Sequence, residues 1–360
     1  MAKILMVAGE ASADRHAAQV IKSLKNILPG VEIFGMGGPE MRSAGMECVY
    51  TMDEISVMGF SGVVPRLSRI LAVMSGIKHL IKERNPDIFI PVDLPDFNMR
   101  LAKFAKAKKV KVLYYIAPQA WAWRKGRAKT LAKTTDGLAV IFPFEEKFFQ
   151  SYGVNARYVG HPFLQEERKT IKAKWPPQRI AIMPGSRSHE VQEILPIMQG
   201  AKRILQKDYP SISWYLPMAK GLPKKLFEEL VDSDVGLTES IPEVDLAMVK
   251  SGTSTFEMAL SGVPEVICYK TSSLNYYLAK AFIGIDQIGM PNIVSGVPIV
   301  PELIQDQFTK QGLVLELRRY IEDESLYNST QDAFIKLCSS MGSQKASEEV
   351  ARWVRSMITM

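Results

Sequence analysis

Short apolar segments alternate with segments of helical pattern along the chain, and this alternation restricts the fold more than any other feature. In the first half, strand-like runs occupy Lys3–Ala8, Val31–Met36, Asp87–Val92 and Lys111–Ile116, with helical patterns between them. A second series begins with Arg179–Met183. Strands separated by helices form parallel β-α-β units with right-handed crossovers. The pattern predicts an α/β protein with two Rossmann-like, doubly wound parallel-sheet domains that face each other across a cleft.

A polar, basic segment with two prolines, QEERKTIKAKWPPQ at 165–178, separates the two series. It has no apolar period, so we interpret it as a linker. We expect the 360 residues to form an N-terminal domain at 1–168, a linker at 169–178, a C-terminal domain at 179–342 and a last helix at 343–360. In two-domain proteins of this kind, the last helix can cross back onto the first domain.

Cysteine and histidine usage argues against a metal centre or a disulfide framework. The three cysteines are scattered, and neither they nor the four histidines have metal-ligand spacing. The N-terminal MAKILMVAGE fits a first strand rather than a signal peptide. No apolar run approaches the roughly 18 residues that cross a bilayer. We expect a cytoplasmic protein that needs no metal and no cofactor.

Residues 245–270 contain, in order, a strand, a glycine loop, a helix, a turn and a second strand. Such a loop leaves N–H groups unpaired at a helix N-terminus, where the dipole favours an anion such as phosphate. Gly252 and Thr253 form the loop, and Glu257 lies close enough to reach a sugar hydroxyl. A capping box between Ser254 and Glu257 explains the same residues equally well.

The first strand of the second series ends in a turn that is rich in small residues and contains one arginine. The turn carries Ser186, Arg187 and Glu190. Arginine can donate two parallel N–H groups to phosphate oxygens, so the turn is a candidate diphosphate site. The structural alternative is a surface ion pair between Arg187 and Glu190 or Glu193.

Two other turns carry polar residues that could contact a ligand. Ser12 follows the first strand, and Asn292 lies in a proline-containing loop. Helix capping and turn chemistry select the same residue types, so both interpretations stay open.

Two carboxylates follow the strand-like run at 88–92, where catalytic groups of α/β enzymes usually project. Asp96 precedes a helix and could serve as its N-cap. Asp93 has no such local role, so we prefer Asp93 as a general base that takes a proton from an attacking hydroxyl.

Two features suggest an anionic surface or a lipid. Residues 100–133 contain 11 Lys/Arg and no Asp or Glu, and they include Trp121 and Trp123. Tryptophans beside arginines favour a headgroup interface, although paired tryptophans also occur in cores. An apolar stripe at helical spacing fits either a membrane-surface or acyl-binding helix, or a buried core helix. The stripe includes Val64, Leu67, Ile70, Leu71 and Met74.

In order, the chain carries the motifs GEASAD, VDLPDFN, YYIAPQAWAWRKGR, GHP, MPGSRSHEV and KSGTSTFEMALSGVP. Together they resemble the lipid-A-disaccharide synthases, inverting bacterial glycosyltransferases with the two-domain GT-B architecture. The resemblance covers nearly the whole chain. One position departs from it, because Ala13 stands where the family's GEASGD has glycine. If that position requires a positive φ, the geometry of the turn is in question.

The resemblance implies a reaction between two lipid substrates. UDP-2,3-diacylglucosamine would donate its sugar to the 6-hydroxyl of 2,3-diacylglucosamine 1-phosphate, giving UDP and a β-1,6 disaccharide 1-phosphate. Asp93 would be the base, Arg187 would lie by the UDP, and Gly252, Thr253 and Glu257 would form the nucleotide pocket.

The resemblance also implies a metal-independent enzyme that associates with the cytoplasmic face of the inner membrane through an apolar patch at 57–81. It implies no nucleic-acid partner and leaves a homodimer open. The alternatives within enzymes are a peptidoglycan-type glycosyltransferase and a UDP-sugar epimerase. A non-catalytic nucleic-acid binder would leave the phosphate-type loops unexplained.

Overall fold

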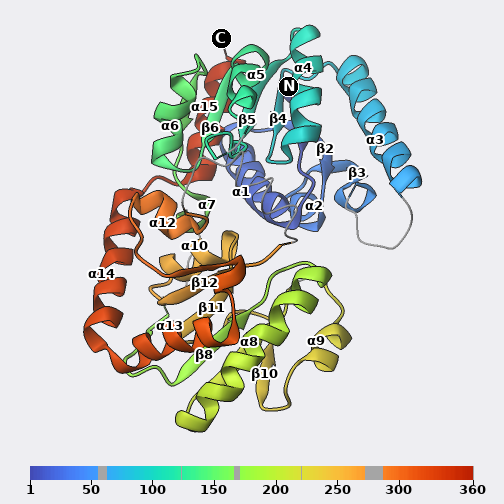
Figure 1. Cartoon of the computed structure of the whole chain (residues 1–360). Coiled ribbons are helices and arrows are strands. Elements are labelled where there is room, and N and C mark those ends of the chain that lie inside the picture. Colours follow the sequence, from blue (N-terminus) through green and yellow to red (C-terminus); the bar gives the residue numbers. More distant parts are fainter. Residues whose placement is uncertain (56–62, 123, 166–170, 220, 272–286, 360) are drawn as a thin grey trace. The chain divides into compact units, whose positions relative to one another are not determined.

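The computed structural model describes residues 1–55, 63–122, 124–165, 171–219, 221–271 and 287–359. The chain divides into two compact units (Figure 1). Unit 1 comprises Met1–Glu166 with Met341–Met360, and unit 2 comprises Glu167–Ser340. Each unit is built on one parallel sheet, so the predicted pair of doubly wound parallel sheets is confirmed.

Unit 1 contains a seven-stranded sheet of order β3-β2-β1-β4-β5-β6-β7. The strands are β1 (Lys3–Val7), β2 (Glu32–Gly37), β3 (Glu47–Thr51), β4 (Ile88–Pro91), β5 (Lys111–Tyr115), β6 (Gly137–Val140) and β7 (Ala156–Tyr158). The helices are α1 (Ala11–Ile27), α2 (Pro39–Ser43), α3 (Val63–Arg84), α4 (Pro95–Ala107), α5 (Gly126–Thr134), α6 (Pro143–Gln150), α7 (Pro162–Gln165) and α15 (Ala346–Ile358).

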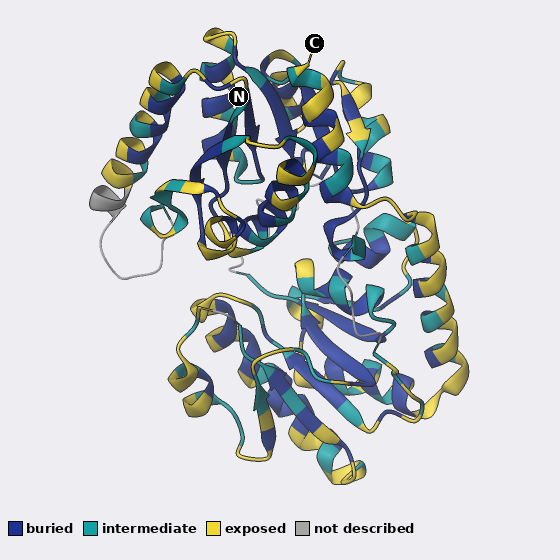
Figure 2. Cartoon of the chain, turned by 180° about the vertical axis from the view of Figure 1, so that it is seen from behind, coloured by how far each residue is buried: buried dark blue, intermediate teal, exposed yellow. Residues whose placement is uncertain are grey.

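Alternate residues of β1 face opposite sides of this sheet, as the pleat of a strand requires. Ile4 and Met6 belong to a core cluster that includes α1 and α15, whereas Leu5 and Val7 belong to a cluster that includes α3 and α4. Figure 2 shows the buried strands in dark blue, with helices whose outer faces are exposed on both sides. Because α15 buries Trp353 and Val354 in the first cluster, the end of the chain completes the core of unit 1.

Unit 2 contains a six-stranded sheet of order β10-β9-β8-β11-β12-β13. The strands are β8 (Arg179–Met183), β9 (Ser213–Pro217), β10 (Val235–Thr238), β11 (Leu246–Lys250), β12 (Glu265–Tyr269) and β13 (Glu302–Ile304). The helices are α8 (Ser188–Asp208), α9 (Lys224–Leu230), α10 (Thr253–Leu260), α12 (Met290–Ser295), α13 (Lys310–Glu322) and α14 (Glu324–Ser340). Within the described ranges, none of the helices in either unit has the length and apolar character needed to span a bilayer.

Candidate active site

Both sheets have a topological switch point, and the sequence motifs follow the strands that form it. In unit 1 the strand order reverses between the adjacent strands β1 and β4, and in unit 2 it reverses between β8 and β11. Ligands of doubly wound sheets bind outside the carboxyl ends of the strands at this point. The turns that follow β1, β4, β8 and β11 are those that begin GEAS, VDLP, PGSR and KSGT.

Asp93 lies in an unusual backbone turn directly after β4. Asp93 and Leu94 both have positive φ angles, 50° and 51°, and each left-handed non-glycine residue costs roughly 1–3 kcal/mol unless its surroundings hold it. Two side chains provide such support. The amide of Asn98, which is fully buried, and the hydroxyl of Tyr114 donate hydrogen bonds to the carbonyl oxygen of Asp93, at 2.8 and 2.7 Å. These two hydrogen bonds therefore hold the strained turn in place.

The carboxyl group of Asp93 titrates higher than an ordinary aspartate. Burial, followed by the negative charge of Glu10, raises its pKa to about 6, against a lowering by the backbone N–H of Leu94. Glu10 follows β1, and apart from its place in GEASAD no sequence pattern selects it. A carboxylate with this pKa is ionised at neutral pH and is more basic than a solvated aspartate.

Gly9 explains how the turns after β1 and β4 lie so close together. A Cβ at Gly9 would stand 2.6 Å from Cδ2 of Leu94 and 2.8 Å from Cδ1 of Ile55. A larger residue there would require the side chains of Leu94 and Ile55 to move.

The expected N-cap role of Asp96 is wrong. The N-cap of α4 is Leu94, and Asp96 lies in the first turn of the helix. Its exposed carboxylate pairs with Arg127 at 2.5 Å and with Arg124 at 3.7 Å. Since Leu94 takes the N-cap position through its backbone, local sequence rules could not identify it.

The departure at Ala13 causes no backbone strain. Helix α1 begins at Ala11 with Glu10 as its N-cap, so Ser12 and Ala13 lie in the first turn of the helix. Ala13 does not have a positive φ. Next to it, the buried Asp14 accepts hydrogen bonds from three backbone N–H groups at the start of α2, those of Gly38, Glu40 and Met41.

Glu190 of unit 2 folds back over the turn that precedes its own helix. Its carboxylate accepts the backbone N–H groups of Ser186 (3.1 Å) and Arg187 (3.3 Å) and pairs with the Arg187 guanidinium (3.2 Å) and the Lys250 ammonium (3.0 Å). Burial raises its pKa, but Lys250, Ser186 and Arg187 outweigh that effect and hold the pKa below the usual value. Gly185, with φ +121°, allows this approach, since a Cβ there would lie 2.5 Å from Oε2 of Glu190. The ion pair between Arg187 and Glu190 that the sequence offered as an alternative is thus present.

The glycine loop after β11 opens helix α10 without a side-chain cap. Gly252 is the N-cap, so the capping box between Ser254 and Glu257 is wrong. The Thr255 hydroxyl donates to the Gly252 carbonyl at 2.8 Å. A Cβ at Gly252 would meet nothing nearer than the Lys250 carbonyl oxygen, 4.0 Å away. Internal packing therefore does not require glycine at this position, and its small size leaves space at the end of α10.

Asn292 is buried and holds its own loop together. Its amide donates to the Val300 carbonyl (2.9 Å) and to Glu302 (2.8 Å), and its oxygen accepts the N–H groups of Ile299 (2.8 Å) and Val300 (3.0 Å). The structure therefore shows the turn role that the sequence left open.

The apolar stripe on α3 divides into a buried half and an exposed half. Met74 and Ile77 are buried in the core, so Met74 fits the core alternative and not a membrane-surface contact. Ile70 is partly buried against the same core. Leu67 and Leu71 are 58% and 48% exposed. The structure does not describe the side chain of Val64.

Trp121 is held by unit 1. Its indole N–H donates to Glu145 at 3.0 Å, and its ring packs edge-on against Phe144 at 5.1 Å. Burial raises the pKa of Glu145 to about 7. Trp123 lies outside the described residues.

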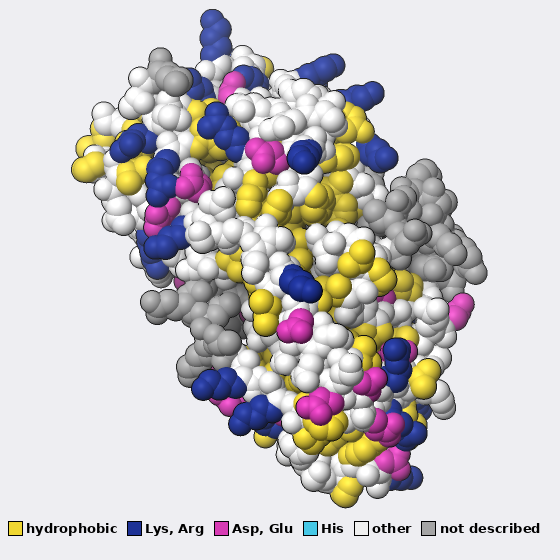
Figure 3. Space-filling model, turned by 90° about the vertical axis from the view of Figure 1, so that its left-hand side faces the viewer, with side chains coloured by type: hydrophobic (Ala, Val, Ile, Leu, Met, Phe, Trp, Pro, Cys, Tyr) yellow, Lys and Arg dark blue, Asp and Glu magenta, His cyan; other side chains and the backbone are white. Residues whose placement is uncertain are grey.

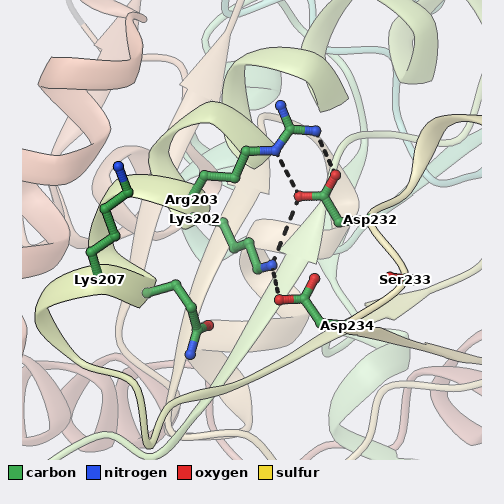
Figure 4. Close-up of a pocket in the computed structure, with 7 residues that line it drawn as sticks. Lys202, Arg203, Lys207, Asp232, Ser233 and Asp234 are labelled. Carbon is green, nitrogen blue, oxygen red and sulfur yellow. Dashed lines mark hydrogen bonds and ion pairs between the residues drawn. The ribbon is translucent and has the colours of Figure 1, made fainter.

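A broad hollow of about 610 Å³ lies away from these turns, between the end of α8 and the segment before β10 (Figure 4). Asp232 pairs there with Arg203, and Lys202 pairs with Asp234. These residues lie at the amino edge of the sheet, opposite the switch point. We therefore interpret their ion pairs as structural contacts between α8 and the segment before β10. In the part of the chain that the structure covers, no cluster of His, Cys, Asp or Glu has the make-up of a metal site.

Two doubly wound units with motifs at both switch points define the GT-B class of glycosyltransferases and related enzymes. UDP-GlcNAc 2-epimerase from Neisseria meningitidis, solved with UDP-GlcNAc, has this fold, with a TM-score of 0.67, 14% identity and coverage of 98% of this chain and 100% of that chain. The calicheamicin glycosyltransferase also has it, with a TM-score of 0.64, 13% identity and coverage of 99% and 98%. At these identities the likeness concerns the fold alone.

The family is shown by sequence. The model of the family described as lipid-A-disaccharide synthetase matches residues 4–354. The lipid-A-disaccharide synthases of Geobacter metallireducens and Anaeromyxobacter dehalogenans are each 38% identical, covering 99% and 98% of this chain and 97% and 96% of theirs. This chain belongs to the lipid-A-disaccharide synthase family and is a glycosyltransferase of lipid A biosynthesis.

Proposed function

We propose that the chain transfers 2,3-diacylglucosamine from its UDP derivative to the 6-hydroxyl of 2,3-diacylglucosamine 1-phosphate by a single displacement. Asp93 takes the proton of the 6-hydroxyl as that oxygen attacks the anomeric carbon, and the bond to UDP breaks. The supporting observation is the rigid turn that presents Asp93 at the switch point with a raised pKa of about 6. A base matched to neutral pH is suited to this proton transfer.

The leaving UDP would be held by unit 2. Arg187 is a surface cation at the end of β8, and the open N-terminus of α10 at Gly252 and Thr253 offers backbone N–H groups. Together they would stabilise the charge that develops on the diphosphate. Glu257, one turn into α10, would bind the ribose, while Ser12 would line the substrate site.

A peripheral position on the cytoplasmic face of the inner membrane fits one side of unit 1. Leu67 and Leu71 are exposed beside Arg69 on α3. Helix α3 packs on α4, and α4 packs on α5. The exposed cations on α4 and on α5 with its preceding turn are Arg100, Lys103, Arg124, Lys125, Lys129 and Lys133. Apolar side chains flanked by cations suit an anionic leaflet. Figure 3 shows the side away from α3, where Lys and Arg side chains project at the upper edge of the view.

The test is a reaction with the two purified lipid substrates in mixed micelles, followed by mass spectrometry. We expect UDP and the disaccharide 1-phosphate in equal amounts. Donor incubated alone should be recovered with its sugar configuration unchanged, because epimerisation at C2 would support the epimerase alternative. Recovery of both substrates intact from folded protein would refute the proposal.

A further inference from the structure

Lys250 is a half-buried cation at the switch point of unit 2. It is the last residue of β11, and its side chain is 18% exposed. Its ammonium nitrogen lies 3.0 Å from Oε1 of Glu190 and 6.0 Å from the centre of the Tyr269 ring. Arg187 contacts the same carboxylate oxygen at 3.2 Å. Two cations from the ends of neighbouring strands therefore meet at one oxygen atom.

This cluster carries more positive than negative charge. One carboxylate faces two cations and two backbone N–H groups, those of Ser186 and Arg187. Across the ranges that the structure describes, no second carboxylate pairs with Lys250 or Arg187. Taking a partly buried lysine out of water costs free energy, which its pairing with Glu190 opposes. The excess charge makes the cluster a place for an added anion.

The surroundings of Lys250 indicate which anion fits. Gly252, two residues further on, is the N-cap of α10, and no side chain caps the helix there. A Cβ at Gly252 would meet no atom nearer than 4.0 Å. Lys250, Arg187 and the end of α10 thus offer donors from three neighbouring segments. Two linked phosphates carry more acceptor oxygens and more charge than a single carboxylate, so they can accept from donors on all three segments at once.

We propose that Lys250 is a second diphosphate-binding cation, which Glu190 holds in place until the sugar nucleotide binds. Glu190 is then a positioning residue, an internal counter-ion for Arg187 and Lys250, and not a contact of the nucleotide. The inference rests on the proposed function, since it takes the diphosphate of the UDP-sugar as the ligand. It adds a residue that the mechanism above does not use.

The test compares UDP with uridine in binding to Lys250→Met, which keeps an unbranched side chain of similar length and removes the charge. We expect the dissociation constant of UDP, from titration calorimetry, to rise roughly ten-fold or more, the size expected for a lost charged hydrogen bond. The dissociation constant of uridine, from competition NMR, should stay within about two-fold. Lys250→Arg should retain most of the UDP affinity. Lys224→Met, at an exposed lysine of α9 paired with Glu228, removes the same charge elsewhere in unit 2 and should bind UDP as the parent does.

The outcomes separate the inference from the proposed function. If Lys250→Met binds UDP as the parent does, or loses UDP and uridine affinity by the same factor, Lys250 has no contact with the diphosphate and the inference fails. Partial unfolding does not obscure this, because it lowers the number of binding sites and not the ratio of the two affinities. If the parent protein neither binds UDP nor forms disaccharide, the proposed function fails instead.

Discussion

The side-chain amide of Asn98 donates a hydrogen bond to the backbone carbonyl of Asp93, five residues before it in the chain, at 2.8 Å. The same nitrogen lies 3.2 Å from the carbonyl oxygen of Val92 and 3.3 Å from that of Val7. One buried amide therefore connects the ends of β1 and β4 and supports the left-handed pair Asp93–Leu94. The position of the proposed base depends on this amide.

Replacing Asn98 by Ala should lower both stability and turnover. The buried carbonyl groups lose a donor and a cavity forms, so we expect unfolding to become easier by about 1–3 kcal/mol. The turn at Asp93 should loosen, and kcat should fall with KM nearly unchanged. Tyr114→Phe removes a single hydrogen bond to the same carbonyl with little change of volume, and should cost about 1 kcal/mol. Urea titration and steady-state kinetics measure both variants. An Asn98→Ala enzyme with parental stability and kcat would show that the amide is dispensable.

Replacing Asp93 by Asn should abolish proton abstraction and leave UDP binding intact. General bases contribute about 10²–10⁴-fold to rate, so kcat should fall within that range. Asp96→Asn is the matched comparison three residues away, at an exposed carboxylate paired with Arg127, and should change kcat by no more than about two-fold. The opposite result, with Asp96→Asn inactive and Asp93→Asn active, would transfer the role of base to Asp96.

The pH dependence of kcat/KM should show the raised pKa of Asp93. A base must be deprotonated in the free enzyme, and the pKa of about 6 places the loss of activity on the acidic side. Below that pH, kcat/KM should fall about ten-fold per pH unit. Glu10→Gln removes the negative charge that helps to raise this pKa, so the acidic limb should move to lower pH. An acidic limb at the pH of an ordinary aspartate, unaffected by Glu10→Gln, would contradict this assignment.

Glu265 should destabilise the protein at neutral pH. It is fully buried at the start of β12, and neither carboxyl oxygen has a hydrogen-bond partner among the described residues. Burial, and then the charge of Glu302, raise its pKa well above the usual value. The folded state therefore binds this proton more tightly than the unfolded chain does, and stability falls as the pH rises above the ordinary pKa of glutamate.

Glu265→Met should therefore stabilise unit 2 by about 1–3 kcal/mol near neutral pH, the usual cost of an unsatisfied buried polar group. The gain should be smaller at about pH 5 than at about pH 8. Above the pKa of free glutamate the unfolded parent releases the Glu265 proton, and this release lowers the parent's free energy of unfolding as the pH rises. Thermal unfolding of both proteins at the two pH values checks this. An equal gain at both would mean that the effect is packing and not ionisation.

The interior strands could be predicted from the sequence because their apolar runs are dense. β8 has the predicted bounds, Arg179–Met183. β3 and β10 had no prediction, and both lie at sheet edges, where several of their residues are only partly buried. An edge strand buries less surface, so its sequence carries a weaker apolar pattern.

The turns that carry the candidate site were predictable in position but not in geometry. Asp93 and Arg187 were selected because they follow strands at the edge where ligands bind. Three features depend on contacts between separate turns: Leu94 as the N-cap of α4, Lys250 beside the Arg187–Glu190 pair, and Glu10 near Asp93. A local pattern does not encode such contacts, which is also why the capping box at Ser254 was wrong.

The two halves of the α3 stripe should respond differently to the same substitution. Leu67→Ser with Leu71→Ser changes exposed side chains, so the protein should remain folded while its affinity for vesicles with anionic lipid falls. Removing two leucines from a bilayer contact should weaken binding at least about ten-fold, given about 1.5–3 kcal/mol for each buried leucine. Ile77→Ser changes a fully buried residue and should destabilise unit 1 by about 2–5 kcal/mol.

Vesicle sedimentation and thermal unfolding of the same samples separate these effects. Leu315→Ser with Ile335→Ser is the matched control, since these residues of α13 and α14 are 62% and 64% exposed on unit 2. The control pair should bind vesicles as the parent does, because it changes at least as much exposed apolar surface at a place without the proposed membrane contact. If both pairs weaken vesicle binding equally, the membrane contact is not specific to α3. If neither does, the exposed leucines of α3 have another role, and the cations of α4 and α5 become the residues to test.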